Sequence, residues 1–167
     1  VAIETCRRLG LHAPIAEQPQ YNILHRTRVE KEYREIFELY QYGTTIWSPM
    51  ASGFLSGKYN SGKTPEGSRL NEPGRGQNIL NTYINSTPDV FDKLQKLEKL
   101  AERIGYSQSQ IALAWVVANT DVTTCILGAS KKSQLQENLK SLELIQKWDK
   151  NIEKEINDIF KNEVSKD

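Results

Sequence analysis

The sequence has little of what metal centres and disulfide frameworks require. It contains two cysteines and two histidines in 167 residues. Cys6 and Cys125 lie far apart, and neither has a cysteine or histidine at metal-ligand spacing. His12 and His25 are isolated as well, without a Ser, Cys or carboxylate at an offset typical of catalysis. We therefore expect no metal site and two reduced, buried or half-buried thiols, which suits the cytosol.

An excess of one charge, long apolar runs and a signal pattern are also missing. The 22 Lys and Arg residues nearly balance the 21 Asp and Glu residues, with no basic block and no acidic tail. This balance gives no electrostatic reason to expect nucleic acid as a partner. No apolar run approaches the roughly 20 residues of a membrane span, and residues 1–8 lack a secretory signal pattern. These absences predict a cytoplasmic protein without a membrane span.

What the sequence does contain is an alternation of short buried strands and amphipathic helices. Strands are expected at residues 14–19, 44–48 and 122–127. Helices are expected at residues 1–10, 29–42, 89–104, 108–118, 128–142 and 151–160. Residues 51–83 are rich in Gly, Ser, Asn and Pro and predict a long, functional or mobile loop. The alternation favours parallel βα units and hence an α/β fold.

Three parallel strands do not close a barrel, because an eight-stranded (β/α)8 barrel typically takes about 250 residues. The chain is therefore either a small open α/β domain or a piece of a larger fold. Residues 1–8 read as the middle of an amphipathic helix, which favours the piece. No Gly-x-Gly-x-x-Gly turn is present, which disfavours a Rossmann dinucleotide domain.

Four segments in order resemble one enzyme family. Residues 47–59 read WSPMASGFLSGKY, and this segment closely resembles the loop after the seventh strand of aldo-keto reductases, most of all in the potassium channel β-subunit branch. The other segments that agree are EQPQYN at 17–22, PEGSR at 65–69, and GAS at 128–130 followed by QLQEN at 134–138. The resemblance covers nearly the whole chain. It implies a (β/α)8 TIM barrel of which residues 1–167 form the C-terminal portion, about strands 6–8 with their helices, without the N-terminal half.

The resemblance also implies a function. The family binds NADP(H), and an intact protein of this kind would reduce small aldehydes or ketones. The catalytic Asp, Tyr and Lys motifs of the family belong to the first half of the barrel and do not occur here, so no catalytic residue is assigned. The alternative is a cytoplasmic regulatory β-subunit that docks on a voltage-gated potassium channel α-subunit and senses bound NADP(H). Self-association into a homo-oligomer fits both alternatives, and an unrelated α/β binding module is the third.

The resemblance assigns the nicotinamide and pyrophosphate ends of the cofactor to two strand ends and a loop. Gln18 would hydrogen-bond the nicotinamide carboxamide, because an amide both donates and accepts. Trp47 would stack on the ring. The remaining residues lie near the pyrophosphate, with the last as its cation: Ser48, Pro49, Met50, Ser52 and Lys58. Met50 replaces the usual Leu, a change that conserves volume. Without the resemblance, Gln18 would be a strand-end residue bonded to backbone.

The adenosine end is assigned to the loop and to the helix after the third strand. Arg69 would lie beside the adenosine. Ser133 with Gln136 predicts a capping box, and the helix start offers free amides to a phosphate. The residues implied at the turn and along one helix face are Gly128 and Ser130 with Gln134 for the 2′-phosphate, and Glu137 and Asn138 for adenine. The alternatives are solvated loop charges and an ordinary capped surface helix.

Overall fold

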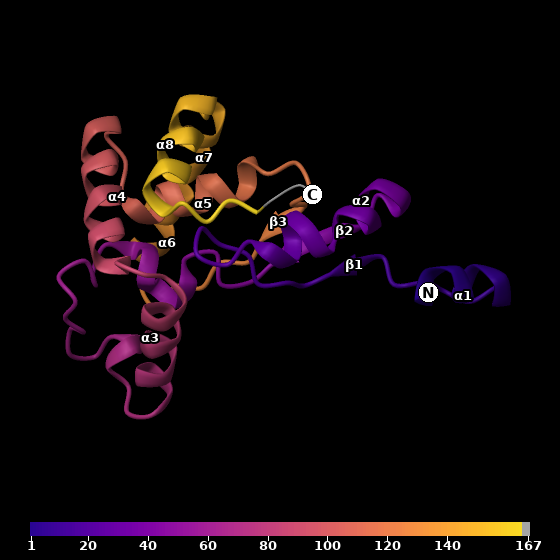
Figure 1. Cartoon of the computed structure of the whole chain (residues 1–167), viewed down its shortest axis with the longest axis horizontal. Helices are drawn as coiled ribbons and strands as arrows, with labels where there is room; N and C mark the ends of the chain where they lie inside the picture. The colour runs from indigo at the N-terminus through magenta and orange to yellow at the C-terminus, as the bar shows by residue number, and fades with distance from the viewer. Residues whose placement is uncertain (165–167) are drawn as a thin grey trace.

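The computed structural model describes residues 1–164 and shows an α/β arrangement around a three-stranded parallel sheet (Figure 1). The strands lie side by side in chain order: β1 (Ala16–Glu17), β2 (Gly43–Ile46) and β3 (Thr124–Cys125). The predicted parallel βα units are thus confirmed. Strands β1 and β3 are shorter than predicted; β1 is an edge strand flanked by Pro14 and Pro19, which have no N–H to donate to a ladder.

The helices at residues 2–9 and 34–40, together with β1, form an arm that extends away from the other helices (Figure 1). Helix α1 (Ala2–Leu9) ends at Gly10, which has a positive φ of 64°, as predicted. The predicted helix 29–42 is interrupted: a π-helical turn, η1 (Arg28–Glu32), precedes α2 (Arg34–Tyr40). The expected end at Gly43 was wrong, because Gln41 already turns left-handed and Gly43 opens β2.

The segment after β2 holds more regular structure than predicted. Two short 3-10 helices, η2 (Ala51–Ser56) and η3 (Arg69–Asn71), are followed by α3 (Arg75–Ser86). The prediction of a loop through residue 83 was therefore wrong for its last part. Helix α3 is mostly polar and buries only a narrow strip that includes Leu80 and Tyr83, so its apolar periodicity is weak.

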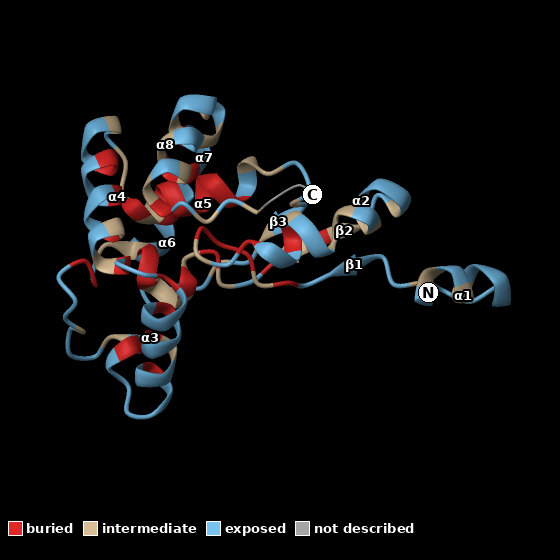
Figure 2. Ribbon diagram, in the orientation of Figure 1, coloured by how far each residue is buried: buried red, intermediate tan, exposed pale blue. Residues whose placement is uncertain are grey.

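Two helices predicted from periodicity form the body of the molecule. Helix α4 (Val90–Ile104) ends at Gly105, and α5 (Gln108–Ala118) begins after Ser107, both as predicted. The Ser107 hydroxyl accepts a hydrogen bond from the Gln110 backbone N–H, and the Gln110 side chain accepts one from the Ser107 N–H. Helix α5 is buried over most of its length, as Figure 2 shows.

The C-terminal helices differ from the prediction at one junction. The predicted helix 128–142 is divided into α6 (Lys132–Leu139) and α7 (Ser141–Gln146), and α8 (Lys150–Phe160) follows. The predicted capping box of Ser133 and Gln136 is wrong, because α6 already begins at Lys132. Gln134 serves the cap instead: its side-chain oxygen accepts a hydrogen bond from the Lys131 backbone N–H at 3.3 Å.

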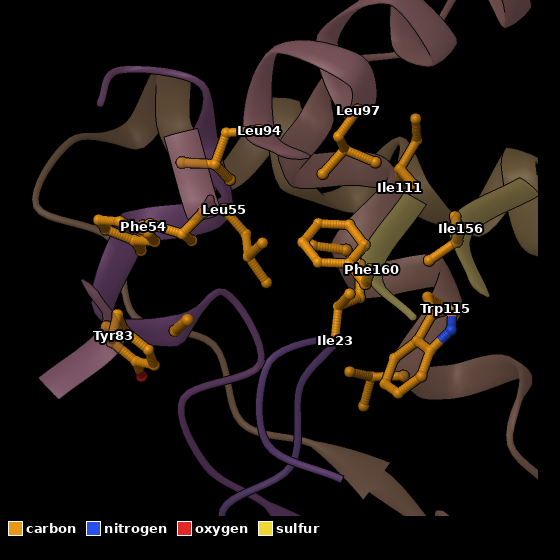
Figure 3. Close-up of a cluster of buried hydrophobic side chains, with 14 of the residues drawn as sticks. Ile23, Phe54, Leu55, Tyr83, Leu94, Leu97, Ile111, Trp115, Ile156 and Phe160 are labelled. Carbon is orange, nitrogen blue, oxygen red and sulfur yellow. The ribbon is translucent and has the colours of Figure 1, made fainter. Parts of the chain in front are cut away.

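The hydrophobic core lies between α4, α5 and α8 and extends to the segment after β2 (Figure 3). Phe54 of η2 stacks on Tyr83 of α3 with ring centroids 5.3 Å apart. Trp115 of α5 packs against Tyr21 at 4.9 Å, as expected for a core tryptophan. Across the part of the chain that the structure describes, no helix combines the length and apolar character needed to cross a membrane.

Candidate functional site

The carboxyl ends of the three strands meet at one edge of the sheet, and several predicted site residues lie there. Ala16 pairs with Gly43 and Thr45 with Thr124, and this register continues to a bridge between Gln20 and Trp47. Because side chains alternate across a strand, Ile46 points into the core while Trp47 points to the other face. The sheet therefore presents its strand ends on a common edge, where active sites of parallel α/β folds are built.

The sheet face opposite the helices is uncovered in this chain. Trp47 is 44% exposed, and Ile126, the next residue after β3, is 42% exposed. Gln18 follows β1 directly and is exposed as well. The structure thus places Gln18 and Trp47 on neighbouring strands, where the indole face and the amide are both open to a ligand.

The turn after β2 is built from the predicted residues Ser48 to Ser52. Ser48 has a positive φ of 55°, and its hydroxyl oxygen accepts a hydrogen bond from the Ser52 backbone N–H at 2.9 Å. Its carbonyl accepts a second one from the Ala51 N–H at 2.9 Å. Pro49 is buried and Met50 is half-buried, so these two residues anchor the turn while the serines stay accessible. Non-glycine residues held at positive φ are typical of functional segments.

A polar cluster behind this turn was missed by sequence reasoning. The Asn22 side chain, fully buried, donates to the Ser48 carbonyl at 3.0 Å. The Gln20 amide donates to the Tyr83 hydroxyl at 3.2 Å. Burial raises the pKa of the Tyr83 hydroxyl. Side-chain hydrogen bonds with four residues oppose that shift: Ser48, Gln20, Asn22 and Ser52. Gln20 and Asn22 stand within the quoted EQPQYN segment, whereas Tyr83 carried no signal because it was assigned to a loop.

The two predicted loop cations lie on the surface. The Lys58 ammonium sits 5.7 Å from the centroid of the Tyr59 ring, and Arg69 is exposed at the start of η3. Elements η2 and η3 contact each other, so both cations belong to one folded segment. Gly76 allows α3 to lie against η3, because a Cβ at this position would stand only 2.5 Å from the Arg69 carbonyl oxygen.

The turn between β3 and α6 brings two predicted residues into direct contact. Gln134 Oε1 accepts hydrogen bonds from the Ser130 backbone N–H at 3.0 Å and from the Ser130 hydroxyl at 3.1 Å. Gly128, Ser130 and Gln134 are all exposed or half-exposed. Because the Gln134 oxygen is engaged in the turn, its NH2 group is the part left to donate to an anion. The first turn of α6 adds free backbone N–H groups.

The other two predicted residues of α6, Glu137 and Asn138, are less accessible than Gln134. Glu137 accepts a hydrogen bond from the Gln110 side chain at 2.7 Å and forms an ion pair with Lys140 at 3.2 Å. Asn138 is buried. Gln134 is exposed and Glu137 is half-buried, whereas the buried Asn138 has little side-chain surface to offer an adenine. Among residues 1–164, no three His, Cys, Asp or Glu side chains gather into a group that could hold a metal ion.

Comparison with known proteins identifies the family of this chain. The aldo/keto reductase family model matches residues 2–159. A Schizosaccharomyces pombe protein named as a voltage-gated potassium channel subunit beta is 46% identical over 156 residues, 92% of this chain and 44% of the relative. Proteins of the same name from Arabidopsis thaliana and Oryza sativa are 40% and 39% identical and are covered to 41% and 43% of their length. The chain spans less than half the length of these relatives. It belongs to the aldo/keto reductase family.

Proposed function

We propose that this chain is the C-terminal portion of a (β/α)8 barrel and carries about its sixth to eighth strands. The family match and the length of the relatives support this proposal. The open sheet face with Trp47 and Ile126 supports it as well, since that face would be the inside of the closed barrel. The intact protein is the complete barrel that contains this chain. We place it in the cytoplasm.

In the intact protein this portion binds NADP(H) at the carboxyl ends of its strands. The groups present fit such a cofactor: an open indole and an amide for the nicotinamide, and a serine turn with a nearby lysine for the pyrophosphate. The observation that carries the proposal is the exposed Ser130–Gln134 turn at the start of α6, because it gathers polar groups and free helix N–H groups where the resemblance to the family implies the adenosine.

The same turn favours NADP over NAD. The two cofactors differ by one phosphate on the adenosine ribose, and a site that prefers NADP supplies donors or positive charge at that point. The Gln134 NH2 group supplies a donor, the Ser130 hydroxyl donates to the phosphate in place of Gln134 Oε1, and Lys131 and Lys132 add positive potential. An NAD site more often places a carboxylate there, which holds the ribose hydroxyls and repels the phosphate. The nearest carboxylate along the chain, Glu137, is already bonded to Gln110 and Lys140.

The reaction we propose for the intact protein is the reduction of an aldehyde or ketone by NADPH. When bound, the cofactor supplies the hydride. This chain's residues would bind and orient it: Trp47 would stack on the nicotinamide and set which of its faces is open, and Gln18 would hydrogen-bond the carboxamide. The acid that completes the reduction belongs to the half of the barrel outside this chain.

Nucleotide titration of the intact protein tests the site. We expect the wild type to bind NADPH more tightly than NADH, and a Ser130→Ala, Gln134→Ala double variant to lose NADPH affinity by about 1.5–3 kcal/mol for each lost charge-assisted hydrogen bond. NADH affinity should change little. A matched control is Gln77→Ala on the exposed surface of α3. Equal wild-type affinities, or equal losses for both nucleotides, would show that this turn does not read the 2′-phosphate.

The barrel proposal has its own test in the 167-residue chain alone. An open sheet face and unpaired strand edges seek partners, so this chain should self-associate and bind an apolar dye. Analytical ultracentrifugation and dye fluorescence measure both properties. A monodisperse monomer with cooperative unfolding and little dye binding would contradict the partial barrel.

A second function is favoured by the names of the relatives. Three of them are named as voltage-gated potassium channel β-subunits. The alternative is therefore a regulatory subunit that docks on a channel α-subunit and responds to the redox state of its nucleotide. Co-purification of the intact protein with a channel α-subunit, set beside turnover of carbonyl substrates, separates the two functions or shows that both are present.

A further inference from the structure

A buried glutamine at the start of α5 has one half of its amide without a partner. Gln108 is 5% exposed, and its Nε2 donates to the Leu94 carbonyl of α4 at 2.6 Å. Its Oε1 has no hydrogen-bond partner among residues 1–164. The amide cannot be turned around to relieve this, because its oxygen would then face the Leu94 carbonyl oxygen. A buried acceptor left without a donor is costly and calls for an explanation.

The unpaired oxygen lies against the end of the segment that follows β2. A Cβ at Gly57 would stand only 2.8 Å from Gln108 Oε1, so no other residue fits there without moving the amide. Gly57 also has a φ of 89°, which favours glycine. It directly precedes Lys58, the cation we assign to the pyrophosphate. Gln108 Oε1 thus lies close to Gly57, near the end of the nucleotide segment, residues 48–58.

The nucleotide segment is held in an uncommon backbone conformation. Three of its non-glycine residues, Ser48, Ala51 and Ser52, have positive φ. Such conformations persist only where the surroundings enforce them, and they cluster at active sites, ligand clamps and switch regions. Next to Gly57 and Gln108 lies an open cavity of about 330 Å³, walled on its far side by α4. The nucleotide segment therefore has room to shift next to Gln108, whose Oε1 has no hydrogen-bond donor among the described residues.

We propose that Gln108 is a positioning residue for nucleotide binding. Its amide is held by the hydrogen bond to the Leu94 carbonyl and leaves space only for a glycine at position 57. When nucleotide is bound, its Oε1 accepts a backbone N–H of the nucleotide segment, so that the bond missing in this structure is made in the complex. This inference rests on the proposed nucleotide site and adds to it a residue that touches no ligand.

The variant Gln108→Leu tests this inference in the intact protein through two readouts of opposite sign. Without nucleotide, the thermal midpoint should stay the same or rise, because a buried unpaired oxygen is removed while the Leu94 carbonyl keeps its helical hydrogen bond. The dissociation constant for NADPH should rise by about tenfold, the value of one hydrogen bond. Ser109→Ala, on the adjacent helix position, is the matched control and should change neither readout.

A second variant links the effect to Gly57. Gly57→Ala puts a methyl group 2.8 Å from the Gln108 oxygen, closer than side-chain atoms pack, whereas the Gln108 Cδ carbon would be at an ordinary 3.7 Å. Its loss of NADPH affinity should therefore be smaller in the Gln108→Leu background than in the wild type, by about threefold or more for contacting residues. Equal losses in the two backgrounds would overturn the proposed contact.

Two results with Gln108→Leu overturn the inference. If NADPH affinity is unchanged, the oxygen makes no bond in the complex. If the midpoint without nucleotide and the affinity fall together, Gln108 only packs α5 against α4. A wild type that binds no nucleotide is a separate failure, which removes the proposed function and this inference with it.

Discussion

The arm that comprises α1, β1 and α2 and the helical body around α4, α5 and α8 differ in how their helices are stabilised. Neither α1 nor α2 contains a buried residue, whereas eight residues of α5 are buried (Figure 2). Both arm helices are short, and isolated helices of this length are marginal in water. The body therefore has its own hydrophobic core, whereas the arm has an amphipathic sequence but no partner surface for its apolar side within the described residues.

The exposed apolar residues of the arm show where that surface is missing. Leu9, Leu11, Ile15 and Leu39 are each more than half exposed. Leu9, Leu11 and Ile15 precede the edge strand β1, which pairs with β2 on one side only in the sheet of the described residues, and Leu39 lies on α2. In the barrel that we propose, the preceding strand and helix would cover the other side of β1.

The largest effect is expected for Trp115→Ala in the body. Trp115 packs on Tyr21 and carries the Arg26 guanidinium 5.0 Å from its ring, so the change leaves a large cavity. We expect a loss of about 3–5 kcal/mol in the free energy of unfolding of the intact protein. Chemical denaturation measures it.

Leu39→Ala on the arm distinguishes packing within this chain from packing against the rest of the barrel. Leu39 is 62% exposed here, so a loss below about 0.5 kcal/mol is expected if the arm stays uncovered. A loss near that of a core leucine, about 2–5 kcal/mol, would show that the remaining half covers α2 in the intact protein. A small loss for Trp115→Ala would contradict the core itself.

Trp47→Ala should affect binding rather than stability, in contrast to Trp115→Ala. Trp47 is 44% exposed, at the open edge of the sheet. Loss of its aromatic area and stacking should weaken NADPH binding by about 1–3 kcal/mol. Fluorescence titration measures the affinity, and circular dichroism checks the fold. Unchanged affinity in a folded variant would remove Trp47 from the cofactor site.

The body was predictable from sequence because strong local signals agree there. Helix α4 has a regular apolar stripe and a terminal glycine, and α5 combines an apolar run with the capping residues Ser107 and Gln110. The family resemblance rested on motifs whose order is preserved, and the family match confirms it. Cys6 and Cys125 are free and half-buried, as predicted.

The misses occurred where tertiary contacts outweigh local pattern. Helix α3 forms from a polar sequence because Tyr83 and Leu80 bury against η2 and η3, a contact that no local periodicity encodes. The hydrogen bond of Asn22 depends on Ser48, 26 residues further along the chain, and the role we propose for Gln108 depends on Gly57. The assigned ligand contacts of the site residues stay predictions.

Alkaline pH should act on the junction between arm and body. The Tyr21 hydroxyl donates to Glu30 at 2.7 Å and accepts from the Asn119 side chain at 3.0 Å. Burial, followed by the negative charge of Glu30, raises the pKa of Tyr21 well above its ordinary value of 10. A raised pKa in the folded state means that stability is full below about pH 10 and falls above it, by about 1.4 kcal/mol per pH unit for one group.

Denaturation of the intact protein between about pH 9 and pH 11 measures this loss. Tyr21→Phe keeps the ring against Trp115 but has no proton to release, so its stability should fall less steeply than that of the wild type. The other buried tyrosines are common to both proteins and cancel in the comparison. If the free energy of unfolding fell equally steeply with pH in both proteins, Tyr21 would ionise without unfolding and the junction would be open to water.

The smallest effect concerns a rate, and it compares one thiol from each region. Cys125 lies in β3 and borders the core, and burial raises the pKa of its thiol to about 12. At pH 8 its reactive thiolate is then about one part in ten thousand, because the ratio follows the difference between pH and pKa. Cys6 lies on α1, which has no buried residue. Iodoacetamide should therefore label Cys6 first, and mass spectrometry of the two peptides measures the rates. Cys6→Ser isolates Cys125 and should label more than about tenfold more slowly than the wild type. Equal rates would mean that the β3 edge opens as readily as the arm, and the contrast between the two regions would then not hold for the sheet.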